Sequence, residues 1–306
     1  MTSSTVDALF ADRIPVLNAP MGGVAGGALA SAVSRAGGLG MIGMGSSGST
    51  TSLRRQLAAV TDGVEVGIGL VDWVVQRDPE MLETALDASP LLLSVSFGET
   101  YEWIGRAHER GVPAVAQVSD APTAERALAA GADALVARGS EGGGHGRPLH
   151  DRDTLLDALL ALTDRPVFAA GAIATAEDVR RVLGRGARAA WVGTAFTACH
   201  EALSSPGSRR ALLAAGPEDT VLTSAFDQAS GYGWPSDIPE RVIANDATRR
   251  WGAALDDGDV DVAGRELRAA TEADDPSGMS VNAGLGVGEL RAERSAAEVV
   301  AALDPR

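Results

Sequence analysis

Short apolar runs alternate with longer amphipathic segments from residue 14 to about residue 200, and Gly or Pro marks nearly every junction between them. Apolar runs of this length are typical of buried parallel strands, which need helical crossovers to connect them. Eight strand-then-helix units are the number that closes a barrel. The sequence therefore predicts an α/β protein built as a TIM-type (β/α)8 barrel.

The pattern also predicts where the elements lie. Strands are expected at residues 14–19, 39–42, 65–70, 91–95, 113–117, 133–137, 166–170 and 189–192. Helices are expected between them at 28–35, 53–60, 80–88, 101–110, 124–129, 154–162 and 176–183, with an eighth starting after Thr194. Thr175 has the character of a helix N-cap, because two acidic residues follow it in the first turn. We expect helices to end at Gly37, Gly111, Gly131 and Gly184.

After about residue 205 the chain becomes more acidic and richer in loops. We expect residues 1–205 to form the barrel and residues 206–306 to form a mostly helical appendage. The appendage is expected to pack beside the active-site mouth and to return to the barrel. Helices are predicted at 238–255, 264–272 and 297–303, and no strand is predicted beyond 220–223.

Composition excludes several functional classes. The formal charge of -15 argues against binding to nucleic acid or to an anionic membrane surface, because both depend on Lys and Arg. All 26 basic residues are Arg, so a lysine nucleophile and the lysine-containing phosphate loop are excluded. Cys199 is the single cysteine, which excludes an internal disulfide and a cysteine-held metal cluster. With neither an export signal nor an apolar span, the sequence predicts a cytoplasmic protein and leaves a homodimer open.

The strongest functional clue is the stretch D-A-L-V-A-R-G-S-E-G-G-G-H at residues 133–145, a strand that ends in a glycine-rich turn carrying one imidazole. Glycines there allow a flat ligand to approach the backbone. His145 is therefore the candidate catalytic or substrate-binding residue, with His150 as its local competitor. His108 and His200 lie on predicted helices and are interpreted as ordinary surface or packing residues.

Other candidates follow further barrel strands at their carboxyl ends, where barrels carry their chemistry. Gln117 ends strand five and suits a hydrogen bond to an amide-like heterocycle. Gly171 and Gly193 follow strands seven and eight, a pair of loops that commonly forms a phosphate cradle from main-chain amides. The Thr194 hydroxyl could add a further donor. These loops indicate a phosphate-bearing ligand.

At this point the sequence resembles the nitronate monooxygenase family, whose relatives include FMN-dependent enoyl reductases and NAD(P)H:quinone reductases. The matching stretches are residues 14–23, 131–146, 165–175, 189–196, 238–245 and 282–290. The resemblance implies an FMN-binding barrel in which His145 is the active-site histidine. The cofactor-binding residues expected on this basis are Ala19, Pro20, Met21, Gly22, Gln117, Arg138, Gly143, Gly144, Ala170, Gly171, Ala172, Gly193 and Thr194, and no metal is expected.

The resemblance also implies an activity, the oxidation of alkyl nitronates and of nitroalkanes with O2 to a carbonyl compound and nitrite. One alternative keeps FMN but takes electrons from NAD(P)H to reduce quinones or enoyl thioesters. A further alternative is a non-redox barrel enzyme acting on a phosphorylated small-molecule substrate. Relatives often have polar side chains where this chain has Gly69 and Leu285, Gln in place of Arg138 and Gly in place of Ala172. The losses at Gly69 and Leu285 bear on nitronate specificity, because those polar side chains line the site in relatives.

Overall fold

The protein contains the eight short parallel strands that the sequence predicts. The structure is a computed structural model, which describes residues 5–256 and 258–306. The barrel strands are β1 (Val16–Asn18), β2 (Met41–Gly43), β3 (Gly67–Val71), β4 (Leu93–Ser96), β5 (Val115–Val118), β6 (Ala134–Arg138), β8 (Val167–Ala170) and β9 (Ala189–Val192). Each lies within two residues of its predicted place.

Hydrogen bonding closes these strands into a ring. Five of them pair in the order β1-β9-β8-β6-β5 and three in the order β2-β3-β4. Single parallel bridges, Leu17 with Leu39 and Leu93 with Ala114, join the two sheets. The order around the ring is therefore the order along the chain, which confirms the (β/α)8 barrel.

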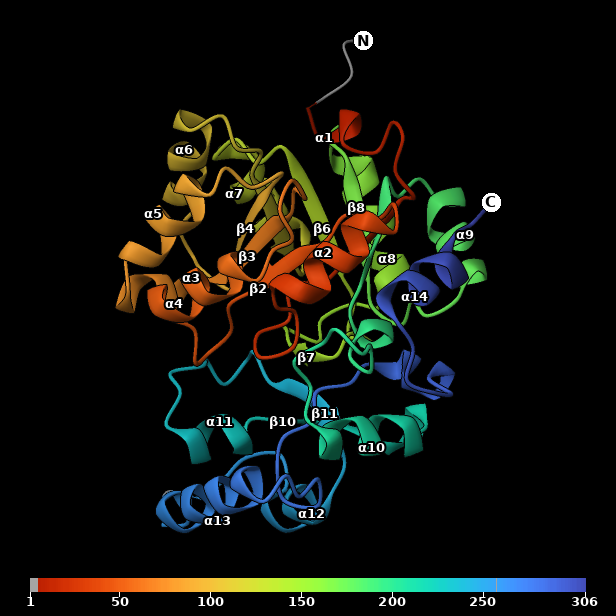
Figure 1. Ribbon diagram of the computed structural model, residues 1–306. Coiled ribbons are helices and arrows are strands. Elements are labelled where there is room, and N and C mark those ends of the chain that lie inside the picture. The colour runs from red at the N-terminus through yellow and green to blue at the C-terminus, as the bar shows by residue number, and fades with distance from the viewer. Residues whose placement is uncertain (1–4, 257) are drawn as a thin grey trace.

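Helices surround the ring on the outside (Figure 1). They are α2 (Gly27–Arg35), α3 (Thr50–Ala58), α4 (Asp72–Arg77), α5 (Glu80–Asp87), α6 (Glu102–Glu109), α7 (Ala121–Ala129), α8 (Arg152–Leu162) and α9 (Ala176–Gly184), with the short α1 (Thr5–Ala8) at one end of the barrel. Thr175 is the N-cap of α9, and Asp178 completes a capping box with it. Gly184 lies inside α9, and Gly186, with φ +112°, takes the left-handed conformation after the helix instead.

The predicted eighth helix after Thr194 is wrong. Only a 3-10 turn, η1 (Thr194–Phe196), follows β9 at that point. The place of an eighth barrel helix is taken by α14 (Ala296–Leu303), which packs against α2, α9 and η1. Its side chains Val300 and Leu303 are fully buried. The barrel wall is thus completed by a segment that returns from beyond the appendage.

The elements between η1 and α14 lie beyond the carboxyl ends of the barrel strands (Figure 1). They are α10 (Pro206–Ala214), η2 (Pro217–Asp219), β10 (Thr220–Thr223), α11 (Ala225–Ser230), β11 (Glu240–Ile243), α12 (Asp246–Trp251), α13 (Val260–Glu272) and η3 (Leu285–Glu289). They have a separate apolar core that includes Phe226, Val242 and Leu267. The division of the chain at residue 205 stays a prediction.

The predicted helix at 238–255 is wrong in its first part, and so is the absence of strands after 223. Residues 240–243 form β11, which pairs antiparallel with β10 and with β7 (Gly144–His145). The β-branched Val242 and Ile243 suit a strand, and these tertiary pairings outweigh the helical pattern. The helix α12 begins only after Asn245, whose side chain caps it.

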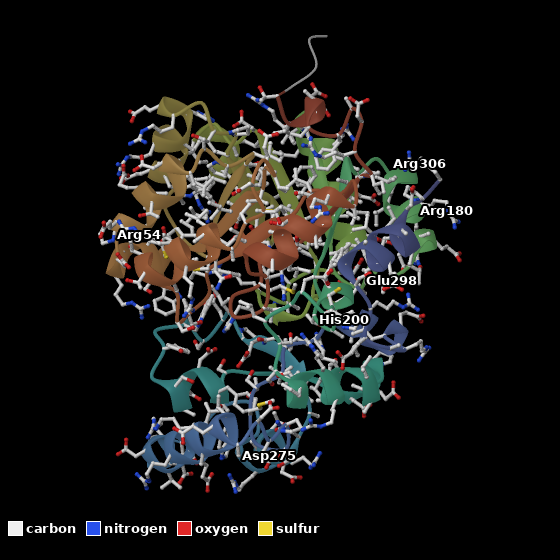
Figure 2. All side chains as sticks on the ribbon, viewed as in Figure 1. Arg54, Arg180, His200, Asp275, Glu298 and Arg306 are labelled. Carbon is white, nitrogen blue, oxygen red and sulfur yellow. The ribbon has the colours of Figure 1, made fainter. Side chains whose placement is uncertain are left out.

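Charged side chains lie mainly at the periphery, as the labelled Arg54, Arg180 and Asp275 show (Figure 2). Leu17, Met41 and Phe168 belong to a buried apolar cluster contributed largely by the barrel strands. Within residues 5–256 and 258–306, none of the helices has both the length and the apolar character that crossing a bilayer requires.

We expect Leu303→Ala to destabilise the barrel by about 2–5 kcal/mol, because it leaves a cavity between α14 and the barrel helices. Leu149 is 51% exposed, so Leu149→Ala is the matched control and should change stability little. Equilibrium denaturation measures both. Equal effects of the two changes would contradict the wall position assigned to α14.

Candidate active site

A cavity of about 930 Å³ opens at the carboxyl ends of the barrel strands. This is the end at which (β/α)8 barrels carry their chemistry. The structure brings together around it every residue predicted from the sequence to bind a cofactor or to act in catalysis. These residues are Ala19, Pro20, Met21, Gly22, Gln117, Arg138, Gly143, Gly144, His145, Ala170, Gly171, Ala172, Gly193 and Thr194.

Two loops after neighbouring strands present main-chain amides to this cavity. Gly171 and Ala172 follow β8 with φ of +119° and +47°, a turn that strongly favours small residues. Gly193 and Thr194 follow β9. In the part of the chain that the structure describes, no hydrogen bond uses the N–H groups of these four residues. They are donors available to an anionic ligand, so the residues present fit a phosphate-bearing cofactor.

The Arg138 guanidinium holds the glycine-rich turn from inside. Its Nη2 donates to the carbonyl oxygens of Gly142 (2.9 Å), Gly143 (3.2 Å) and Gly144 (2.9 Å). A Cβ on Gly142 would lie 3.2 Å from this guanidinium, and one on Gly143 would lie 2.6 Å from the nitrogen of Gly284. Packing within the protein therefore excludes a side chain at Gly143 and crowds one at Gly142. The expectation that a flat ligand approaches these glycines stays a prediction.

Arg138 also places a positive charge in the wall of the cavity. Burial lowers its pKa to about 10, with Arg241 lowering it further and Glu141 raising it. A pKa of about 10 leaves the group charged at neutral pH. The carbonyl oxygens of the turn solvate that charge, so the cation favours an anionic or electron-rich ligand beside it.

His145 is fixed by four contacts, three from the elements beyond the barrel and one from the loop after β4. It lies on β7, whose pairing with β11 sets its backbone. Its Nε2 is 2.8 Å from Oδ2 of Asp227, and both side chains are largely buried. The indole of Trp234 stacks on the imidazole with ring centroids 3.6 Å apart, and Phe97 meets it edge-on. Because an ionised carboxylate only accepts, Nε2 carries the proton and Nδ1 is the ring nitrogen left for a ligand.

Asp227, Trp234 and Glu240 line the cavity, but sequence reasoning did not find them. Asp227 is 82 positions from His145, and no local spacing connects the two. One signal was present: aromatic residues make up only 4% of the chain, yet Tyr232 and Trp234 are close together in a loop. The Trp234 indole donates to Oγ of Ser46 (2.8 Å) and so ties this loop to the barrel mouth.

Glu240 is a buried carboxyl group beside this cluster. It is 4% exposed, and its Oε2 accepts hydrogen bonds from Asn282 (2.6 Å) and Ser280 (3.2 Å). Burial raises the pKa of Glu240 to about 7; the charge of Asp227 adds to the rise, and His145 opposes it. The group therefore carries its proton in a large fraction of molecules at neutral pH.

The Cys199 thiol and the other described imidazole groups do not line this cavity. His150 is exposed, and its backbone carbonyl accepts from the amide of Ser140. His108 is half exposed beside Asp133, and His200 is 58% exposed (Figure 2). Burial raises the pKa of the Cys199 thiol to about 12, which makes it a poor nucleophile. His145 is therefore the histidine to consider for catalysis.

Comparison with known proteins assigns the family. The nitronate monooxygenase family model matches residues 3–80 and 63–305. The chain belongs to the nitronate monooxygenase family. Members of this family are flavin enzymes, so the chain is a flavin-dependent oxidoreductase that acts on a small-molecule substrate.

Individual relatives agree with this assignment. A nitronate monooxygenase of Paraburkholderia phytofirmans is 32% identical over 260 residues, which cover 69% of this chain and 71% of that protein. A hydroxy-methyl-oxo-octahydroindene-carboxyl-CoA dehydrogenase of Mycobacterium tuberculosis is 29% identical over 248 residues, covering 79% and 68%. The structure of a nitroalkane oxidase from Streptomyces ansochromogenes superposes with a TM-score of 0.81 at 29% identity, covering 98% of this chain and 96% of that chain.

This nitronate monooxygenase family member is expected to differ from its relatives at positions 69 and 285, and the two positions lie differently with respect to the cavity. Gly69 lines the cavity, and a Cβ at this position would collide with the ring of Pro20, so a larger side chain requires Pro20 to move. Leu285 was expected to remove a polar group from the site. Among the described residues the cavity is lined by Gly286 and not by Leu285, and the effect of a polar side chain at position 285 stays a prediction. The amide of Leu285 instead donates to the carbonyl of Glu141 (3.0 Å).

We expect the wild-type protein to lose stability as the pH rises through 7, and the Glu240→Gln variant to be free of this loss. The carboxyl pKa is 4.5 ordinarily and about 7 in the folded chain, so between these values the folded state keeps a proton that the unfolded state has released. This contribution to stability is complete below pH 4.5 and declines by roughly 3 kcal/mol as the pH rises through 7. The variant should gain on the wild type between pH 5 and 8 in the free energy of unfolding, measured by urea denaturation. A difference independent of pH would disprove the assignment.

Proposed function

We propose that the protein is an FMN-dependent oxidoreductase that oxidises alkyl nitronates, and nitroalkanes, with O2 to a carbonyl compound and nitrite. The observation that carries the proposal is the His145–Asp227 pair on the wall of the cavity that also contains the amide cradle. The family membership and the similarity to a nitroalkane oxidase support it.

The cofactor's binding residues follow from the two sides of the cavity. Gly171, Ala172, Gly193 and Thr194 would hold the phosphate of FMN through their amides. Met21 and its neighbours Ala19 and Pro20 would lie against the ring system, and Gln117 would bond its polar edge. When bound, FMN supplies the electron acceptor for the substrate and the route of those electrons to oxygen.

His145 would act on the substrate through Nδ1. With a nitronate, the doubly protonated imidazolium would donate a hydrogen bond from Nδ1 to the nitro oxygens. With a neutral nitroalkane, Nδ1 accepts the α-proton, and the carbon–hydrogen electron pair stays on the substrate as the nitronate. Asp227 stabilises the imidazolium that forms and holds the ring in the required tautomer. Trp234 and Phe97 cover the ring and limit the access of water to it.

A second activity, reduction of a quinone or an enoyl thioester with electrons from NAD(P)H, is favoured by the lining of the cavity. Apolar side chains from the elements beyond the barrel contribute to that lining. These are Leu203, Leu212, Phe226, Leu267 and Met279. An apolar lining of this kind suits an apolar substrate larger than a small nitronate, and the Mycobacterium tuberculosis relative is named for a carboxyl-CoA substrate.

Anaerobic reduction separates the two activities and the non-redox alternative. We expect the purified protein to carry a yellow flavin that nitronate bleaches and that NADH and NADPH bleach only slowly, because the first route needs no nicotinamide. Rapid bleaching by NADH or NADPH alone would establish the reductase instead. A colourless protein that takes up no added FMN would favour a barrel enzyme acting on a phosphorylated substrate.

Replacing His145 tests the mechanism. We expect His145→Asn to retain flavin and to lower turnover of a neutral nitroalkane by roughly 10²-fold, the scale of general base catalysis. Asp227→Asn keeps the imidazole but removes the charge that stabilises it, so it should lower the same rate while flavin content stays unchanged. Rates with pre-formed nitronate should fall less, since no proton is removed. Unchanged turnover in both variants would assign the role elsewhere.

A further inference from the structure

Glu240 stands directly opposite His145 in the ribbon that connects β7 and β11. The register pairs Glu240 with His145 on one side and with Thr223 of β10 on the other. Side chains of directly opposite residues in an antiparallel pair project from the same face. Both side chains line the one cavity, as does Asp227 from α11. Glu240 thus belongs to the wall on which the substrate of His145 would lie.

The hydrogen bonds of Glu240 identify which of its oxygens carries the proton. Asn282 and Ser280 both donate to Oε2, so Oε2 is an acceptor and the acid proton belongs on Oε1. In the described part of the chain no hydrogen bond to Oε1 is found. The side chain is almost completely buried, yet Oε1 is not among the described side-chain atoms that are buried without a partner, and Glu240 lines the cavity. Oε1 is therefore the oxygen that a ligand in the cavity can reach.

Burial favours the neutral form of this carboxyl group, and the charge of Asp227 adds to that preference, whereas His145 opposes it. Asp227 already provides the negative charge that pairs with His145, and a second carboxylate in the same buried cluster would repel it. Asn282, Ser280 and Thr223 are neutral. The adjacent Arg241 extends to the carbonyl of Ser140, away from the carboxyl of Glu240. Two carboxyl groups in one site with opposite protonation states are typical of divided roles, one as an ion and one as a proton donor.

We propose that Glu240 is a substrate-binding residue whose neutral carboxyl group donates a hydrogen bond from Oε1 to a nitro or carbonyl oxygen of a substrate lying against His145. The inference rests on the proposed function for the identity of this oxygen. The same hydrogen bond could be donated to a nitro oxygen of a nitroalkane or nitronate and to the carbonyl oxygen of a thioester. It makes binding at this position depend on the neutral form of Glu240, because an ionised Glu240 would both lose the donor and repel an electron-rich oxygen.

The test uses a ligand that cannot react. The compound 2-methyl-2-nitropropane has a nitro group but no α-hydrogen, so it can neither ionise nor be oxidised through a nitronate. Its dissociation constant is measured on the flavin-loaded protein by calorimetry between pH 5.5 and 8.5. We expect wild-type affinity to fall roughly fivefold to tenfold as the pH rises through 7, the effect of losing one hydrogen bond.

Two variants separate Glu240 from the other titrating groups. In Glu240→Gln the amide oxygen can accept from Asn282 and Ser280 while the NH2 donates, so affinity should stay at the wild-type low-pH level across the range. Glu240→Leu should bind roughly fivefold to tenfold more weakly than the wild type at pH 5.5. His145 and Asp227 are unchanged in all three proteins, so a difference between them is assigned to position 240. Glu125→Gln, on an exposed face of α7, is the matched control and should behave as wild type.

The outcomes decide the proposal without reference to turnover. A flat wild-type profile, or the same pH dependence in Glu240→Gln as in the wild type, would overturn it. Equal weakening in the Gln and Leu variants at pH 5.5, with flavin content and Tm unchanged, would overturn it as well. Failure of the proposed nitroalkane activity appears separately, as absence of nitrite production by a wild type that still shows the expected binding profile.

Discussion

The antiparallel pairing of Gly144 and His145 with Glu240 and Arg241 is the interaction on which the rest of the site depends. This ribbon of two residue pairs joins the loop after β6 to the elements beyond the barrel. It places the backbone of His145 and brings Glu240 opposite to it. Asp227, on α11, then reaches the imidazole from the same side. Without this pairing the histidine would sit on a glycine-rich loop with nothing to fix its direction.

Rigidity around the site comes from arginine side chains that bind carbonyl groups. Arg138 holds three carbonyls of the glycine-rich turn, Arg241 holds that of Ser140, and Arg152 holds those of the turn after β8. Each guanidinium provides several donors in a fixed plane, which suits it to several acceptors on one loop. The loops that line the cavity are therefore held by charge-assisted bonds although they are rich in glycine.

The sequence was sufficient for the barrel because its signals are local. Buried strands of four to six residues, capped helices such as the one after Thr175 and glycines between them specify each unit without reference to distant contacts. One wall of the cavity could be predicted for the same reason, because the glycine-rich turn and the residues at the strand ends are local features of the sequence. The opposite wall depends on pairings between distant segments. Glu240 lies where a helix was predicted, and Asp227 meets His145 only after the whole chain has folded.

The place of α14 in the barrel wall has a consequence for synthesis of the chain. The apolar faces of α2 and α9 are synthesised well before α14, which follows α9 by more than a hundred residues. Until then the nascent barrel exposes an uncovered apolar seam, which is the kind of surface at which aggregation begins. Closing the barrel wall thus requires contacts between α14 and helices that are far from it in the sequence. Contacts with such large sequence separation form slowly, so we expect this step to be late in folding.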